Sequence, residues 1–412
     1  MHEPCQEKAG LKEVIRFFAW LGLVSFGGPA GQIAMLREEL VERRRWLDAD
    51  EFSRGLHFCL LLPGPEAHQL AIYSGWKMQG LRGALAAAIL FVLPAALLLW
   101  VLSALYACYG KLDAVQTVFE MVRPAVLAII IAALVRMARH HLAGGRAWLM
   151  AGGAFVALFF FHVPFPWVVV FALGLGLVTR AQRTGARSAG ISVAAPVSWR
   201  AVGVVALLWI APVLLAAIVF GHDNILAALG MFFSKAALLT FGGAYAVLPY
   251  VAGHAVDAGW LSAQAMQDGL ALAESTPGPL IIVLQFAGFF AGWNHPAPFS
   301  PLAMATLGAA MTTWVTFLPS LCFILIGAPY IDRLAQSPRA SAVLATVGAA
   351  VVGVIANLAA WFAAGVFAPG QHQALAAVMT GAALWLLIGR GWSIPSVLGI
   401  ATAAGLLRAL MM

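Results

Sequence analysis

The chain has 412 residues, is 62% hydrophobic and 10% charged, and carries a net charge of +7. Soluble domains are about 25% charged, so this composition excludes an ordinary soluble protein. The basic residues lie in short loops between apolar runs, which is typical of membrane proteins and does not indicate nucleic-acid binding. Many of these runs exceed the roughly 20 residues that cross a bilayer as a helix, and they do not alternate like barrel strands. We therefore predict an all-α polytopic membrane protein.

Two apolar segments in the first half are interrupted by glycine and proline. Segment 14–35 is broken at Gly27-Gly28-Pro29, and segment 56–76 is broken at Pro63-Gly64-Pro65. Helix interiors tolerate these residues least. Both segments are therefore predicted to be broken helices.

The remaining apolar runs carry no such interruption and are predicted as about nine full spans. They cover 84–108, 118–138, 147–163, 164–179, 201–221, 300–327, 341–367, 374–389 and 394–411. A basic linker rich in Ser, Gly and Ala, residues 180–200, lacks helical periodicity and is predicted to be cytoplasmic. It divides the chain into an N-terminal repeat, 1–179, and a C-terminal repeat, 201–412.

The interruptions of the first half return in the second half. Phe26-Gly27-Gly28-Pro29 corresponds to Phe241-Gly242-Gly243-Ala244 at an offset of 215, and Pro63-Gly64-Pro65 corresponds to Pro277-Gly278-Pro279 at an offset of 214. Internal repeats of this kind are typical of secondary transporters. The interrupted segments of the second half are 226–250 and 268–293.

The distribution of Lys and Arg predicts that the halves have opposite orientations. The loop 36–55 is rich in Arg and should be cytoplasmic, and Lys77 and Arg82 place the end of segment 56–76 on the same side. That segment is therefore predicted to be a re-entrant hairpin. The equivalent loop 251–267 contains no Lys or Arg and should be external. We therefore predict an inverted-topology repeat, in which the extra span before segment 226–250 reverses the orientation of the second half in the membrane.

A helix that restarts after such a break presents unbonded N–H groups, which form an anion site without a formal charge. Irregular backbone survives in a bilayer only where it is buried in protein or lines a cavity. We therefore predict that the four breaks converge on a small oxyanion. The predicted substrate-binding residues are Ser25, Phe26, Gly27, Gly28, Pro63, Gly64, Pro65, Lys235, Thr240, Phe241, Gly242, Gly243, Ser275, Thr276, Pro277 and Gly278.

Two cations lie inside apolar sequence. Lys235 precedes the second Gly-Gly break, and an intramembrane lysine is by default a functional hypothesis. The alternatives for Lys235 are a pair with a buried acid or snorkelling to the interface. Arg123 precedes Pro124 near the start of a span, where snorkelling is at least as reasonable as a functional role.

Two acids are predicted to couple transport to protons. Glu66 directly follows Pro-Gly-Pro, and Glu274 lies three residues before Pro277. Burial disfavours the charged form of a carboxyl group, so either acid can change protonation during transport. The alternative is a structural carboxylate at a helix terminus. Gln69 and Gln285 either line the cavity or form ordinary hydrogen bonds between helices.

With these motifs the chain resembles the chromate ion transporter family in its long form with two homologous halves. The duplicated Phe-Gly-Gly and Pro-Gly-Pro motifs carry the resemblance, together with Trp46-Leu47 and its partner Trp260-Leu261. It implies efflux of chromate across the bacterial inner membrane, driven by proton entry and conferring resistance. One departure is that Gly243 precedes Ala244 where the first half has Pro29.

Three classes of function were compared. The prediction is a secondary transporter of a tetrahedral oxyanion, with a sulfate transporter or an uncoupled anion channel as alternatives. A membrane enzyme is not predicted, because no nucleotide-binding loop or haem pattern is present. The four cysteines are scattered, so no metal or other cofactor is predicted. The N-terminus is predicted to be cytoplasmic and the C-terminus periplasmic, and the sequence leaves open whether the chain forms a homo-oligomer.

Overall fold

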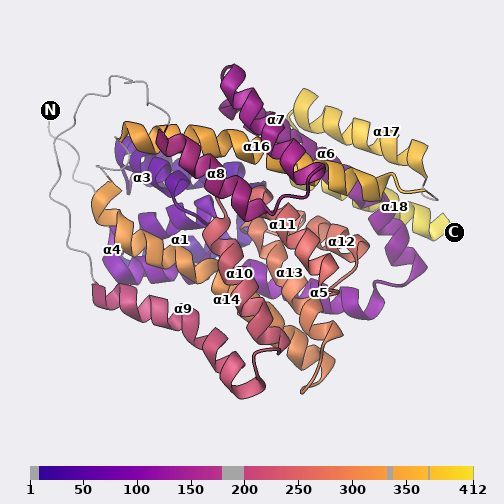
Figure 1. The fold of residues 1–412 in the computed structure, drawn as a ribbon, viewed down its shortest axis with the longest axis horizontal. Helices are drawn as coiled ribbons and strands as arrows, with labels where there is room; N and C mark the ends of the chain where they lie inside the picture. Colours follow the sequence, from indigo (N-terminus) through magenta and orange to yellow (C-terminus); the bar gives the residue numbers. More distant parts are fainter. Residues whose placement is uncertain (1–8, 179–198, 332–336, 370–371, 412) are drawn as a thin grey trace.

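The computed structural model describes residues 9–178, 199–331, 337–369 and 372–411. Within these ranges the chain forms helices and no strand (Figure 1), which confirms the predicted all-α class. The linker 180–200 lies outside the described residues except for its last two positions. The predicted boundary between the two repeats, which falls in this linker, is therefore not tested.

The described helices of the first half follow the predicted segments. They are α1 (Leu11–Val24), α2 (Gly28–Arg37), a π-helix η1 (Glu38–Arg43), α3 (Ala49–Leu61), α4 (Glu66–Leu90), α5 (Leu93–Tyr109), α6 (Asp113–His141), α7 (Gly145–Phe159) and α8 (Phe165–Val178). Within α4 the backbone leaves the helical conformation at Gln79 and Gly80, so residues before and after this kink run in different directions.

The second half repeats this order after one additional helix, α9 (Trp199–Phe220). The others are α10 (Ile225–Leu239), α11 (Ala244–Asp257), α12 (Ala263–Glu274), the 3-10 turn η2 (Leu280–Ile282), α13 (Val283–Asn294), α14 (Pro301–Gly327), η3 (Ala328–Tyr330), α16 (Pro338–Val366), α17 (Gln373–Leu384), η4 (Trp385–Gly389) and α18 (Ile394–Met411). Helices α6 and α16 have the same length, 29 residues, and begin 225 positions apart.

Six helices in the described part of the chain are long and apolar enough to cross a bilayer, and they include six of the nine predicted full spans. The other three predicted spans, 147–163, 164–179 and 374–389, form shorter helices. At 1.5 Å per residue, the 15 residues of α7 extend only about 22 Å, short of the roughly 30 Å hydrocarbon core.

All four predicted breaks are confirmed. Helices end at Val24, Leu61, Leu239 and Glu274, and the chain restarts as a helix at Gly28, Glu66, Ala244 and Leu280.

The chain folds back on itself at the breaks. Phe17 in α1 contacts Trp46, which follows α2, at 5.8 Å between ring centroids. The equivalent pair in the second half, Phe232 and Trp260, lies at 5.5 Å. The ends of the next hairpin in each half also meet: Lys77 forms an ion pair with Glu51, and Asn294 Nδ2 donates to the Trp260 carbonyl at 2.8 Å. Each break is therefore the tip of a helical hairpin.

Two segments predicted as loops are largely helical. In 36–55, α2 continues into η1 because Glu39 forms ion pairs with Arg43 and Arg44 at 2.9 and 3.0 Å, and the Asp48 side chain caps α3. In 251–267, α11 continues to Asp257. Helix α12 begins at Ala263, and the hydroxyl of its N-cap residue Ser262 accepts a hydrogen bond from the Ala265 N–H. These local polar pairs satisfy helix ends that hydropathy alone does not reveal.

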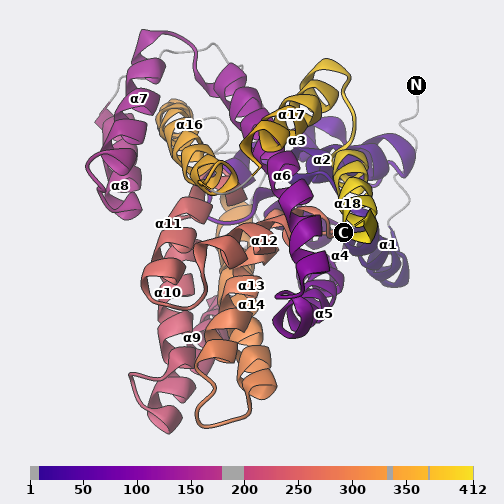
Figure 2. The same ribbon diagram turned by 90° about the vertical axis from the view of Figure 1, so that its right-hand side faces the viewer.

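The last two helices of each half pack on the other half. Helices α7 and α8 lie against α16, whereas α17 and α18 lie against α6 (Figure 2). The two contacts are alike in detail: a Cβ built on Gly176 of α8 would lie 2.7 Å from Val343 Cα, and one built on Gly405 of α18 would lie 2.7 Å from Val118 Cα. Val118 and Val343 are themselves 225 positions apart. The two halves are therefore interlocked.

We expect Gly278→Ala to destabilise the protein. Gly278 has φ +105°, and a Cβ there would lie 2.5 Å from Ala95 Cβ. Strained backbone of this kind costs about 1–3 kcal/mol, and the collision adds to it. Gly391→Ala is the matched control, because Gly391 also has positive φ but a Cβ would meet open space. Thermal denaturation of the purified protein in detergent should show the larger loss for Gly278→Ala, and equal losses would contradict this prediction.

Candidate functional site

The four hairpin tips meet inside the protein, and we call residues 25–28, 62–66, 240–243 and 275–280 the crossing. Its centre is a pair of reciprocal backbone hydrogen bonds. The Gly64 N–H of the first half donates to the Thr240 carbonyl at 2.6 Å, and the Gly278 N–H of the second half donates to the Ser25 carbonyl at 2.8 Å. Each Pro-Gly-Pro turn thus binds the Phe-Gly-Gly turn of the other half.

The surroundings of the two central glycines also correspond. A Cβ built on Gly64 would lie 3.0 Å from Ser320 Oγ, and one built on Gly278 would lie 2.5 Å from Ala95 Cβ. Ala95 and Ser320 occupy equivalent positions, 225 residues apart. The backbone of the crossing is therefore nearly symmetric, but one side presents a hydroxyl where the other presents a methyl group.

Two glutamines extend the hydrogen bonding around the crossing. Gln32 Nε2 donates to the Gly278 carbonyl at 2.5 Å, and Gln69 Nε2 donates to the Pro63 carbonyl at 2.7 Å. Gln285, in contrast, donates to the Ala96 carbonyl and accepts from Thr313, which is the ordinary interhelical role. Sequence reasoning missed Gln32, although an amide about one turn after the Gly-Gly break was a signal for it.

Several buried polar atoms at the crossing lack a hydrogen-bond partner. They are Ser25 Oγ, Gln32 Oε1, Gln69 Oε1 and Ser320 Oγ, in side chains that are at most 1% exposed. Buried polar groups are normally satisfied, and each exception calls for an explanation. A bound polar molecule or ordered water that accepts and donates at this point would satisfy them.

Both predicted acids lie at the N-terminus of α11. Glu66 is part-exposed, and its Oε1 lies 3.6 Å from a Cβ built on Gly243, the N-cap of α11. Glu274 is buried and accepts a hydrogen bond from the Tyr245 hydroxyl at 2.6 Å. The two carboxyl groups come from different halves, and both contact residues at the start of one helix: Glu66 lies at the N-cap, where the helix dipole favours negative charge, and Glu274 binds the hydroxyl of a first-turn tyrosine.

The structure does not bring every predicted residue into this arrangement. Lys235 is exposed on α10 and does not contact the buried polar groups of the crossing, so its position agrees with the snorkelling alternative. Ser275 lies at a tip but is exposed, and its hydroxyl donates to the Ala271 carbonyl. Thr240 and Thr276 also donate to carbonyls one turn earlier, which leaves their oxygen lone pairs, but not their protons, for a ligand.

Arg123 corrects the snorkelling hypothesis. Its side chain is buried and forms two hydrogen bonds with Asp268, from Nε to Oδ1 at 2.6 Å and from Nη2 to Oδ2 at 3.0 Å. Asp268 is not exposed at all. Sequence reasoning missed it because its partner is 145 residues away, and no local pattern marks such a pair.

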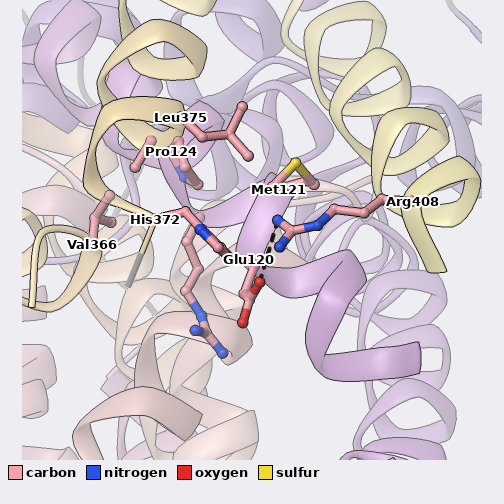
Figure 3. A pocket seen from close by; sticks show the side chains of 9 residues that line it. Glu120, Met121, Pro124, Val366, His372, Leu375 and Arg408 are labelled. Atoms are coloured by element: carbon pink, nitrogen blue, oxygen red, sulfur yellow. Dashed lines mark ion pairs between the residues drawn. The ribbon is translucent and has the colours of Figure 1, made fainter. Parts of the chain in front are cut away.

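A small pocket beside α6, lined in part by Arg123, is distinct from the crossing (Figure 3). It lies between α6, α17 and α18, where Arg408 forms an ion pair with Glu120 at 3.5 Å beside His372. Its volume of about 10 Å³ is roughly the space of one water. It is too small for a tetrahedral oxyanion.

Comparison with known proteins agrees with a two-part chain. The model of the family described as chromate transporter matches residues 12–177 and again residues 227–407. A chromate transport protein of Pseudomonas aeruginosa is 36% identical over 347 residues, covering 82% of this chain and 77% of that protein. A chromate transport protein of Cupriavidus metallidurans is 28% identical over 367 residues, covering 84% and 80%. No solved structure matches the chain.

We expect Gln32→Leu to weaken the crossing. The change leaves the buried Gly278 carbonyl without its side-chain donor, which costs about 1–3 kcal/mol. Gln373→Leu is the control, since Gln373 makes a similar bond to the Phe367 carbonyl at an exposed position and should change stability by about 0.5 kcal/mol or less. Thermal denaturation of both variants measures the difference, and an unchanged midpoint for Gln32→Leu would refute the role of this bond.

Proposed function

Because the chain belongs to the chromate transporter family, we propose that it exports chromate across the bacterial cytoplasmic membrane and thereby confers chromate resistance. The family membership makes it a multi-pass membrane transport protein and not an enzyme. The observation that carries the proposal is the crossing, where hairpin tips from both halves surround buried polar atoms without partners.

We place the oxyanion at the crossing, against the restarted helices. The N-terminus of α11 offers backbone N–H groups and the positive end of a helix dipole. The Ser25 and Ser320 hydroxyls are buried at the crossing without a hydrogen-bond partner, so each can donate its proton to an anion oxygen. A tetrahedral dianion presents four oxygens in a compact volume, so several short contacts from both halves can hold it.

The two halves are proposed to have inverted topologies, with the crossing near the midplane. Helix α9 supports this arrangement: Val202 and Val205 near its start belong to a buried cluster made of first-half residues and the end of α14, and Phe220 at its end contacts Phe299 before α14, with 5.6 Å between ring centroids. Helix α9 therefore connects the side from which the hairpins of the first half enter to the side from which the hairpins of the second half enter. We further propose a cytoplasmic N-terminus, as the basic loops predict, and a periplasmic C-terminus; the pairing of Arg408 with Glu120 puts the end of the chain on the side at which α6 begins.

Protons are proposed to be coupled through Glu66 and Glu274. Like charges at one site oppose each other, so a dianion at the α11 N-terminus favours the protonated form of both carboxyl groups. This linkage makes a proton and the anion travel together, which differs from the exchange with incoming protons that the family resemblance implies. With one proton bound per dianion the exported charge is −1, so an inside-negative potential favours exit by about 2.3 kcal/mol per 100 mV without incoming protons.

The function is tested by chromate uptake into inverted membrane vesicles, in which uptake corresponds to export. We expect uptake that requires the protein and falls when the membrane potential is clamped to zero. Acidification should strengthen chromate binding, and Glu66→Gln or Glu274→Gln should reduce this pH dependence because each removes one protonation step. Absence of uptake would refute chromate export, and an unaltered pH dependence in both variants would remove these acids as proton carriers.

We also expect sulfate to compete with chromate. Both are tetrahedral dianions of similar size, and a site made largely of neutral N–H and hydroxyl groups distinguishes them weakly. Chromate flux measured in a large excess of sulfate should fall, whereas an equal concentration of chloride serves as the control for ionic strength. Unchanged flux in sulfate would mean that the site recognises chromate by more than charge and shape.

A further inference from the structure

A buried polar network joins the two halves to one side of the crossing. Asp268 in α12 accepts both hydrogen bonds from Arg123 in α6 and a third from the Tyr106 hydroxyl in α5 at 2.7 Å. Arg123 Nη2 also lies 3.3 Å from Gln116 Oε1, which accepts from Gln264 Nε2 at 2.6 Å. Helices α5 and α6 of the first half are thereby bonded to α12 of the second half.

Aromatic side chains pack around the ion pair of Arg123 and Asp268. The ring of Tyr106 packs edge-on against Phe119, Phe286 and Phe290, with centroids 5.4–5.7 Å apart. These phenylalanines are at most 8% exposed, and Arg123 and Asp268 are 4% and 0% exposed. We call these six residues the Tyr106 cluster; its ion pair and its phenylalanines are buried, whereas Tyr106 itself is half-buried.

The Tyr106 cluster lies between the crossing and one face of the molecule. Helix α12 enters at Ala263 and reaches its tip at Glu274, so Asp268 is about 9 Å along the helix from the tip. Gln264 and Gln116, near the first residues of α12 and α6, are outside the cluster and more exposed. Going inward from this face, the order is the glutamine pair, the Tyr106 cluster, and then the crossing.

Stability alone is a weak explanation for this ion pair. Desolvation of two charges largely cancels their attraction, so a buried salt bridge contributes little compared with apolar residues of the same volume. The residues at the positions equivalent to Arg123 and Asp268 are Gly348 and Arg54. The duplicated sequence therefore does not repeat this combination of an arginine and an aspartate at the corresponding positions.

We propose that the Tyr106 cluster is a gate that closes the path between the crossing and the face at which α12 begins. This inference rests on the proposed transport function, which requires that the crossing open to each side in turn. The gate opens when α5 and α6 separate from α12 and α13. Arg123 and Asp268 act as positioning residues that hold these elements together in the closed state.

The first experiment measures access to the crossing without any transported anion. Ser275→Cys, an exposed tip residue, is introduced into a chain whose four native cysteines have been replaced. A membrane-impermeant thiol reagent is applied to right-side-out and to inverted vesicles. With the cluster intact, labelling should be slow from the face at which α12 begins. In R123L/D268L/Y106F it should become about tenfold faster from that face, the change produced by a shift of about 1.4 kcal/mol in the gate equilibrium.

The triple change removes both charges and the Tyr106 hydroxyl together, so no buried charge is left unpaired, and membrane insertion should be retained. E51Q/K77Q is the control, because it removes an ion pair that closes a hairpin of the first half and should leave labelling from the α12 face unchanged. The gate is refuted if the triple variant labels no faster than the parent, or if the control labels equally fast. Since no chromate is present, these results stand even if the protein transports another anion.

The second experiment locks the proposed gate. Gln116→Cys and Gln264→Cys place thiols where the two amide side chains meet, and a short bifunctional thiol reagent joins α6 to α12. Cross-linking should abolish chromate flux in vesicles, and reduction of a cleavable cross-link should restore it. Each single-cysteine variant treated with the same reagent is the control. Undiminished flux in the cross-linked protein would overturn the gate, whereas absence of flux before cross-linking would count against chromate transport itself.

Discussion

The fold depends on how four interrupted helices satisfy their backbone groups inside an apolar protein. An unpaired N–H or C=O in such surroundings costs several kcal/mol, so a break can persist only where another part of the chain supplies a partner. Here the partners are other breaks: Gly64 binds Thr240, and Gly278 binds Ser25. Neither half can make these bonds alone. The backbone chemistry at the crossing therefore requires turns from both halves.

Much of this arrangement could be predicted from the sequence because Gly and Pro mark it directly. The breaks and their matched spacing followed from residues whose backbone preferences are strong and local, and the hairpin of 56–76 was predicted from the basic residues on both sides of it. The helical character of 36–55 could not be predicted from hydropathy, since it depends on ion pairs such as Arg43 with Glu39. The pair of Arg123 with Asp268 was not predictable either, because it depends on tertiary packing between helices distant in sequence.

The side chains at the crossing are less symmetric than its backbone. Glu66 corresponds to Leu280, Tyr245 to Ala30, and Ser320 to Ala95. A nearly symmetric set of hydrogen-bonded turns thus carries ionisable and hydroxyl groups unequally. This division of roles is reasonable for a transporter. The backbone hydrogen bonds must be satisfied in both halves, whereas a proton or an oxyanion needs only one set of side-chain partners.

The interlocked helices limit how such a molecule can move. Helices α7 and α8 are bound to α16, α17 and α18 are bound to α6, and α6 also contacts α16. These six helices form one unit that draws on both halves, so the halves cannot rotate apart as separate bodies without breaking apolar contacts on both sides. Motion between this unit and the hairpins is less costly. Arg123 lies on α6 and Asp268 on a hairpin helix, so their ion pair spans the boundary along which such motion would take place.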